Sequence, residues 1–168
     1  MKKILIALFA AALFITSCSK TGPTGPTGPA GANGNANVHG TYYSIDPANW
    51  DWDPVNNLNY VTITNNNISS NIIDSGGTVN VFITGDNITW YACPYTIEGN
   101  PSVNYSFAYS LNTIQINRSN SNQANIPPTI TIYAKVVTIT ASQRKAFPAT
   151  NWQDYNQVMA ITRAGNVK

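Results

Sequence analysis

Short runs of β-branched and aromatic residues, in which apolar and polar side chains alternate, are the feature that most constrains the fold of this chain. In 78–84 the apolar residues Val79, Val81 and Ile83 fall on one face and polar residues on the other. Similar alternation recurs in 102–110 and 129–139. One dry face and one wet face are typical of an antiparallel sheet with a single buried side. The pattern therefore predicts an all-β fold.

Turn-forming residues divide the chain from Val38 onward into short segments. Clusters of Asn, Gly, Pro and Ser separate the runs, and Gly85-Asp86-Asn87 has the composition of a tight hairpin turn. Such spacing predicts an antiparallel β-sandwich of about seven to eight strands with one short C-terminal helix. The expected strands are 38–45, 58–64, 78–84, 88–93, 102–110, 112–118 and 129–139.

The one segment with a helical pattern and a cap is 151–158. Asn151 is the expected N-cap, and Trp152, Tyr155 and Met159 recur at the spacing of one helical face. The sequence also allows a helical turn around Ile68–Ile73. For the core we expect the alternating apolar residues of the clearest strands to point inward, namely Val81, Ile83, Phe107, Ile132 and Val136.

The first residues have the composition of an export signal. Lys2 and Lys3 precede an unbroken apolar run of twelve residues, 4–15. A helix needs about 20 apolar residues to span a bilayer, so the run fits the hydrophobic region of a signal peptide instead. The following Ile-Thr-Ser-Cys resembles the lipobox of bacterial lipoproteins. The resemblance implies that 1–17 is a signal peptide, cleaved before Cys18, whose sulfur is acylated.

A lipid-modified Cys18 would attach the chain to a membrane through acyl chains. Each buried methylene contributes roughly 0.8 kcal/mol, and more than one chain makes the attachment durable. Ser19 follows the cysteine rather than the Asp that is associated with inner-membrane retention. The resemblance therefore implies a bacterial outer-membrane lipoprotein, on either the periplasmic or the outer face.

A glycine repeat follows the cysteine. Glycine recurs at every third position from Gly22 to Gly34, which is the period of collagen, but there are only five triplets and the last two lack proline. We expect 18–37 to be a collagen-like, extended Gly/Pro-rich tether in front of a β-sandwich domain at 38–168. This domain, which we call the head, is then expected to be a monomer. A trimer wound through these triplets is the alternative.

The charge balance excludes a nucleic-acid surface. Only 10% of residues are charged, with nine Lys and Arg against seven Asp and Glu. Lys2 and Lys3 lie in the expected signal peptide, so the remaining seven basic and seven acidic side chains cancel. A phosphate-binding surface needs a basic stripe, and this sequence has none.

Aromatic and acidic residues gather in one predicted loop, Trp50-Asp51-Trp52-Asp53. Exposed indole rings could stack on sugar rings while the carboxylates accept hydroxyl protons, which would make a ligand platform. Alternatively, one or both tryptophans cap an open end of the sandwich, where large aromatic side chains bury much area. A third alternative is a calcium site that adds Asp46 and Asn56 to the two aspartates, since Ca²⁺ takes six to eight oxygen ligands.

Other chemistry-bearing residues are isolated. The single histidine, His39, is far in sequence from Cys93, which is expected to be a small buried apolar residue. One histidine and one free cysteine make zinc implausible. The sequence contains no GxSxG, HExxH, P-loop or dinucleotide fingerprint. We therefore expect no catalytic, cofactor-binding or metal-binding residues, and no enzyme.

Several longer stretches carry a family resemblance. The leader ending in GANGNANV resembles small bacterial lipoproteins with a collagen-like leader and an uncharacterised β-sandwich head. IIDSGGTVNVFITGDNITWYACPYTI resembles their strand–hairpin–strand core, and YAKVVTIT and NWQDYNQVMAIT resemble their long strand and closing helix. The resemblance implies a non-catalytic cell-envelope protein with a structural or adhesive role. The alternative is a carbohydrate-binding module that uses the Trp50/Trp52 loop, so the expected partner is a glycan or an envelope protein.

Overall fold

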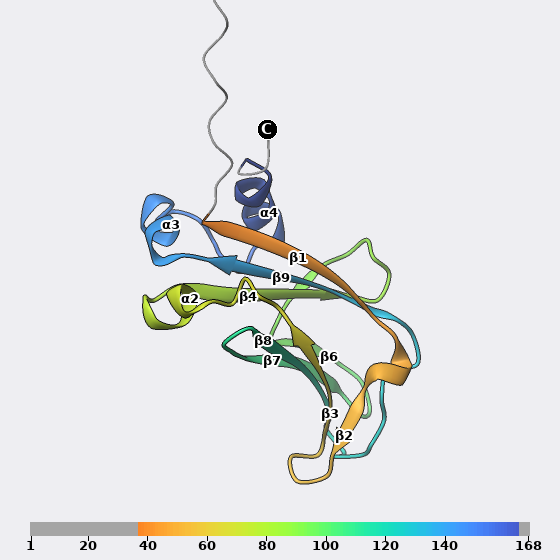
Figure 1. The fold of residues 1–168 in the computed structure, drawn as a ribbon. Helices are drawn as coiled ribbons and strands as arrows, with labels where there is room; N and C mark the ends of the chain where they lie inside the picture. The colour runs from red at the N-terminus through yellow and green to blue at the C-terminus, as the bar shows by residue number, and fades with distance from the viewer. Residues whose placement is uncertain (1–36, 165–168) are drawn as a thin grey trace, which may run out of the picture. The chain divides into compact units, whose positions relative to one another are not determined.

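The computed structural model describes residues 37–164. The predicted signal peptide (1–17), the predicted acylated Cys18 and the predicted tether, apart from Asn37, lie outside the described residues. Within 37–164 the chain forms nine strands in two antiparallel sheets. The expected all-β sandwich is therefore confirmed (Figure 1).

The two sheets are called sheet A and sheet B. Sheet A has the order β1-β9-β4-β5, formed by β1 (Val38–Ile45), β9 (Ile132–Ile139), β4 (Thr78–Thr84) and β5 (Tyr91–Ala92). Sheet B has the order β2-β3-β8-β7-β6, formed by β2 (Asp51–Asp53), β3 (Leu58–Thr64), β8 (Thr113–Asn120), β7 (Val103–Ser110) and β6 (Tyr95–Ile97). The chain crosses from sheet A to sheet B between β1 and β2 and again between β5 and β6.

Three of the predicted strands have the expected bounds: β1, β3 and β4. The strand expected at 88–93 is shorter because the Asp86 carboxylate accepts hydrogen bonds from the backbone N–H groups of Ile88 and Thr89, at 2.8 and 2.9 Å. Those two residues therefore belong to the turn and not to the ladder. Strands β2 and β6 were not predicted, because three residues are too few to display a period.

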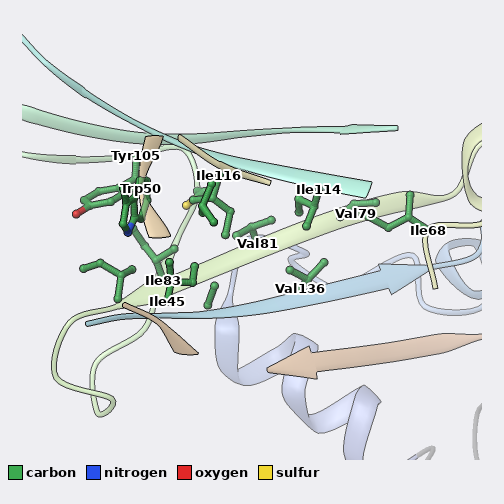
Figure 2. Close-up of a cluster of buried hydrophobic side chains, with 14 of the residues drawn as sticks. Ile45, Trp50, Ile68, Val79, Val81, Ile83, Tyr105, Ile114, Ile116 and Val136 are labelled. Carbon is green, nitrogen blue, oxygen red and sulfur yellow. The ribbon is translucent and has the colours of Figure 1, made fainter. Parts of the chain in front are cut away.

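The core lies between the two sheets (Figure 2). Four of the five expected core residues are buried, and Phe107 is only half-buried against the cluster. Phe107 lies at the margin of the core, because the last three residues of β7, which follow it, are exposed. The side chains in the cluster come from both sheets and include Ile45, Val61, Val79, Val81, Ile83, Tyr105, Ile114, Ile116, Ile132 and Val136.

The outer face of sheet A is also covered. Helix α4 (Tyr155–Ala164) lies on the side of sheet A that faces away from sheet B (Figure 1). Its Val158 packs with Phe82 of β4 and Val137 of β9 in a second apolar cluster. Strands β4 and β9 are therefore buried on both faces. The alternation of residues predicts that one face of β4 is exposed to solvent, and this prediction is wrong, because α4 covers that face. Asn80 on that face donates from Nδ2 to the backbone carbonyl of Trp152 at 2.6 Å.

The helices differ from expectation in their bounds. Helix α4 begins four residues after Asn151, because the Asp154 carboxylate accepts the Gln157 N–H at 3.0 Å and so caps the first turn. Helix α2 (Ser70–Asp74) fulfils the expected helical turn, whereas α3 (Ala141–Ala146) and the 3-10 turn η2 (Pro47–Asn49) were not predicted. None of the helices in 37–164 is long and apolar enough to cross a membrane.

A lysine and two aromatic rings fasten α4 to sheet A. Lys135 Nζ of β9 lies 4.2 Å from the ring centroid of Trp90 and 4.8 Å from that of Tyr155. The two rings are nearly parallel, with centroids 5.4 Å apart and an interplanar angle of 4°. The Lys135 ammonium also donates a hydrogen bond to the Tyr155 hydroxyl. This arrangement places a cation–π contact at the first turn of α4.

Burial in the core predicts a large effect for Ile114→Ala. The Ile114 side chain is fully buried between the sheets, whereas Leu111 in the adjacent turn is 54% exposed. Truncating Ile114 should lower the free energy of unfolding by about 2–5 kcal/mol, because apolar burial is lost and a cavity remains. Leu111→Ala should change it by less than about 0.5 kcal/mol. Urea titration followed by tryptophan fluorescence measures both, and equal effects would contradict this description of the core.

The contact between Lys135 and the two rings predicts that the charge of Lys135 holds α4 in place. Lys135→Met keeps the aliphatic stem but removes the cation, so the free energy of unfolding should fall by about 0.5–2 kcal/mol. Lys145→Met, on the exposed face of α3, is the matched control and should have no comparable effect. Thermal unfolding at low and high salt measures both variants. Identical behaviour of the two would show that packing alone docks the helix.

Candidate functional site

The predicted tryptophan platform is not present at Trp50. Its ring is 8% exposed and lies edge-on to Tyr105, with centroids 6.3 Å apart and an interplanar angle of 73° (Figure 2). The short η2 turn after β1 directs Trp50 into the end of the sandwich, which is the alternative role that the sequence allowed. Trp52 is half-buried and pairs in register with Asn59. The two rings therefore do not form an exposed pair.

The two aspartates of that loop have different surroundings. Asp51 is exposed, whereas the Asp53 carboxylate accepts hydrogen bonds from the backbone N–H groups of Val55 and Asn56 at 2.8 and 3.1 Å. The Asn56 side chain donates to the same carboxylate at 2.7 Å, and these bonds lower the pKa of Asp53. Asn56 thus presents a donor where a calcium ligand would present an oxygen. Within 37–164 no three His, Cys, Asp or Glu side chains group as metal ligands.

Cys93 is a small buried residue, as expected. Its side chain is 3% exposed, and burial raises the pKa of the thiol to about 12. Its backbone N–H donates to the carbonyl of Val81 at 2.8 Å, which ties the turn after β5 to the centre of sheet A. A thiol with such a raised pKa stays protonated near neutral pH and is a poor nucleophile.

A cavity that the sequence analysis missed opens at one end of the sandwich. We call it the end cavity; its volume is about 340 Å³. Its walls come from the last residues of β4, from β5 and β6, from sheet B, and from the segment 128–132 that leads into β9. Tyr91 and Tyr95 form one wall, with stacked rings whose centroids are 4.2 Å apart at 15°. Ile97 and Ile130 are exposed at its rim.

A row of side chains across sheet B forms the back of the end cavity. Tyr95, Tyr105 and Arg118 are directly opposite one another on β6, β7 and β8, so they point to the same face. Burial raises the pKa of the Tyr105 phenol, and the adjacent Arg118 guanidinium acts in the opposite direction. The row therefore places the Arg118 cation beside the buried Tyr105 phenol, at the end of sheet B that lines the end cavity.

The same end of sheet B holds the loop 121–131 in position. The Arg118 Nη1 donates to the carbonyl of Ile126, and Asn59 Nδ2 donates to Asn125 Oδ1 at 2.8 Å. Asn120 Nδ2 donates to the carbonyl of Ala124 at 3.0 Å. These inward-facing polar side chains fix the loop whose end forms part of the cavity wall.

The charge of Arg118 is not neutralised by a carboxylate. Its Nε is buried and has no hydrogen-bond partner, and within the part of the chain that the structure describes Arg118 forms no ion pair. None of the described residues that line the end cavity is acidic. A guanidinium partly removed from water is stabilised by an opposite charge. The end cavity is therefore a positive, largely apolar site.

The end cavity lies at the opposite end of sheet A from the point where the chain enters the head. In the β1–β9 register, Val38 pairs with Ile139 and Ile45 pairs with Ile132. Ile132 lines the cavity, and Val38 is the first residue of β1. Eight residues of extended strand span about 25 Å. That distance separates the cavity end from the end that follows the predicted tether.

No family model, curated protein or solved structure matches this chain. The cavity was missed in the sequence because its residues come from separate strands whose pairing is not apparent from the order of residues. One signal was available: Ile114, Ile116 and Arg118 alternate along β8, which places a lone arginine on the inward face.

The buried thiol predicts slow chemical modification of Cys93. In a Cys18→Ser variant Cys93 is the only thiol, because the sequence contains two cysteines. At pH 8 we expect an aromatic disulfide reagent to react with the folded protein at least 100-fold more slowly than with the urea-unfolded protein, since burial disfavours the thiolate. Absorbance of the released thiolate measures the rate. Comparable rates in both states would show that Cys93 is accessible.

Proposed function

We propose that this chain is a lipid-anchored protein of the bacterial outer membrane whose β-sandwich head binds a partner and catalyses no reaction. The observation that carries the proposal is the place of the end cavity. It opens about 25 Å from Val38, the first residue of β1, which follows the predicted tether. Within the head, the cavity and the residue that follows the predicted tether therefore lie at opposite ends of sheet A. This geometry suits capture of a partner in an adhesive or structural role.

The head's reactive side chains have structural roles, which supports binding over catalysis. The Asp86 carboxylate accepts hydrogen bonds from the Thr84 hydroxyl at 2.6 Å and from two backbone N–H groups of the β4–β5 turn. These bonds lower the pKa of Asp86 to about 2, so the turn keeps its anionic acceptor at any physiological pH. Asp53 has the same role in the turn after β2, and the Cys93 thiol is held protonated by burial.

The sequence supplies the anchor of the proposal. The apolar run 4–15, the lipobox-like residues before Cys18 and the glycine repeat occur in the order of an export signal, an acylation site and a spacer. Two or three acyl chains on one cysteine give durable attachment where a single chain binds reversibly. The proposed partner of the head is then a glycan or protein of the cell envelope or its surroundings.

The proposed anchor predicts lipid labelling at Cys18. Cells that express the full chain should incorporate radiolabelled palmitate into it, and the protein should stay in the membrane fraction after a high-salt wash. Cys18→Ala should abolish the label, because the acceptor sulfur is lost. Cys93→Ala is the matched control and should keep both label and location, since Cys93 is buried in the head. Wild-type protein that carries no label and is released by salt would overturn the anchor.

A further inference from the structure

We propose that the end cavity binds an acidic sugar, a carboxylate-bearing pyranose unit of a polysaccharide. The inference rests on the proposed binding role of the head and names the ligand class of the same site. Three properties of the cavity carry it: an aromatic wall, one unneutralised guanidinium and a set of hydroxyl groups. Each corresponds to one part of a uronic acid ring.

The aromatic wall fits the C–H face of a sugar ring. Tyr91 is 39% exposed and its ring is stacked on Tyr95, so together they present aromatic surface to the cavity. Ile97 and Ile130, which are 46% and 56% exposed, extend this apolar surface at the rim. One face of a pyranose ring carries axial C–H groups. Packing that apolar face on such a wall removes few polar groups from water. The cavity volume of about 340 Å³ lies in the range of small-ligand sites.

The guanidinium selects an acidic ligand over a neutral one. Arg118 is the one charged residue among those described that line the cavity, and no carboxylate of residues 37–164 pairs with it. Its Nη1 already donates to Ile126, which fixes the guanidinium plane. A carboxylate is the anion whose geometry matches that plane, and a pair formed away from bulk water is stronger than one on the surface. A ligand carboxylate would therefore supply the missing counter-charge.

The hydroxyl groups distinguish a sugar from an aromatic acid or a peptide terminus. Tyr91, Tyr95, Tyr105 and Thr129 contribute hydroxyls to the residues that line the cavity. A hydroxyl donates and accepts, so several of them together match a ligand that carries hydroxyls around its ring. Tyr95 is already hydrogen-bonded to Tyr91, and Tyr105 to Arg118, so a bound sugar would join an existing network of hydroxyls. An aromatic carboxylic acid carries no ring hydroxyls that could join it. Because the rim residues Tyr91, Ile97 and Ile130 are exposed, the cavity is accessible from solvent at its rim.

The experiment uses the mature chain, residues 18–168, with Cys18→Ser so that it is soluble. Isothermal titration with trigalacturonate and with trimannuronate tests the acidic sugars, maltotriose tests a neutral sugar, and a tripeptide ending in phenylalanine tests a peptide carboxylate. We expect saturable binding of at least one acidic trisaccharide, at least tenfold tighter than that of maltotriose or the peptide. Raising the salt concentration should weaken it, because the guanidinium–carboxylate attraction is screened.

Matched variants locate the site. Tyr91→Ala and Arg118→Gln should each weaken acidic-sugar binding at least tenfold. Tyr109→Ala removes a tyrosine that is 43% exposed on β7 and does not line the end cavity, and Arg144→Gln removes an exposed charge on α3, so both should bind as the parent does. Circular dichroism and thermal melting confirm folding. If Arg118→Gln unfolds, Tyr91→Ala decides, since its side chain is at an exposed edge.

Several results would overturn the ligand assignment. These are binding of neither acidic trisaccharide, equal binding of maltotriose, tighter binding of the peptide, or acidic-sugar binding that survives Tyr91→Ala. Failure here is distinct from failure of the proposed anchor. Palmitate labelling without acidic-sugar binding overturns the ligand alone, whereas acidic-sugar binding without labelling overturns the anchor alone.

Discussion

Burial of sheet A on both faces is the constraint on which the head depends. Its central strands β4 and β9 pack against sheet B on one side and against α4 on the other. Burial on two faces explains why Phe82 and Val137, which point away from sheet B, are as fully buried as Val81 and Val136. The helix is required for this arrangement, since without it a row of apolar side chains on sheet A would face water.

Sheet B has a different internal division, between a dry core and a polar end. On β8 the inward residues Ile114 and Ile116 are fully buried, and two residues later the same face carries Arg118. The polar end has two consequences. Asn59 and Arg118 hold the loop 121–131 through hydrogen bonds, and the space between that loop and the tyrosines is the end cavity. An apolar residue in place of Arg118 would extend the core but would leave the loop without one of its hydrogen bonds.

Sequence alone predicted those parts of the fold that rest on local pattern. The bounds of β1, β3 and β4 follow from alternation and from the turns that flank them. The short strands β2 and β6 depend on pairing with β3 and β7, which no local pattern displays. Alternation also could not show that the second face of β4 is covered, because Asn80 reads as solvent-facing and is instead bonded to the segment that precedes α4.

The candidate site was harder to predict, and Trp50 shows why. The composition of its loop suggests a ligand site, because two tryptophans and two aspartates in four residues are unusual. The function of Trp50 is set by its position after η2, where its ring enters the core and lies edge-on to Tyr105. Tyr105 stands in the row with Tyr95 and Arg118, so Trp50 packs against the residue at the centre of the cavity's back wall. The loop that composition singled out thus supports the end cavity from within the core, and the ligand-facing surface is formed by tyrosines and an arginine that no motif connects.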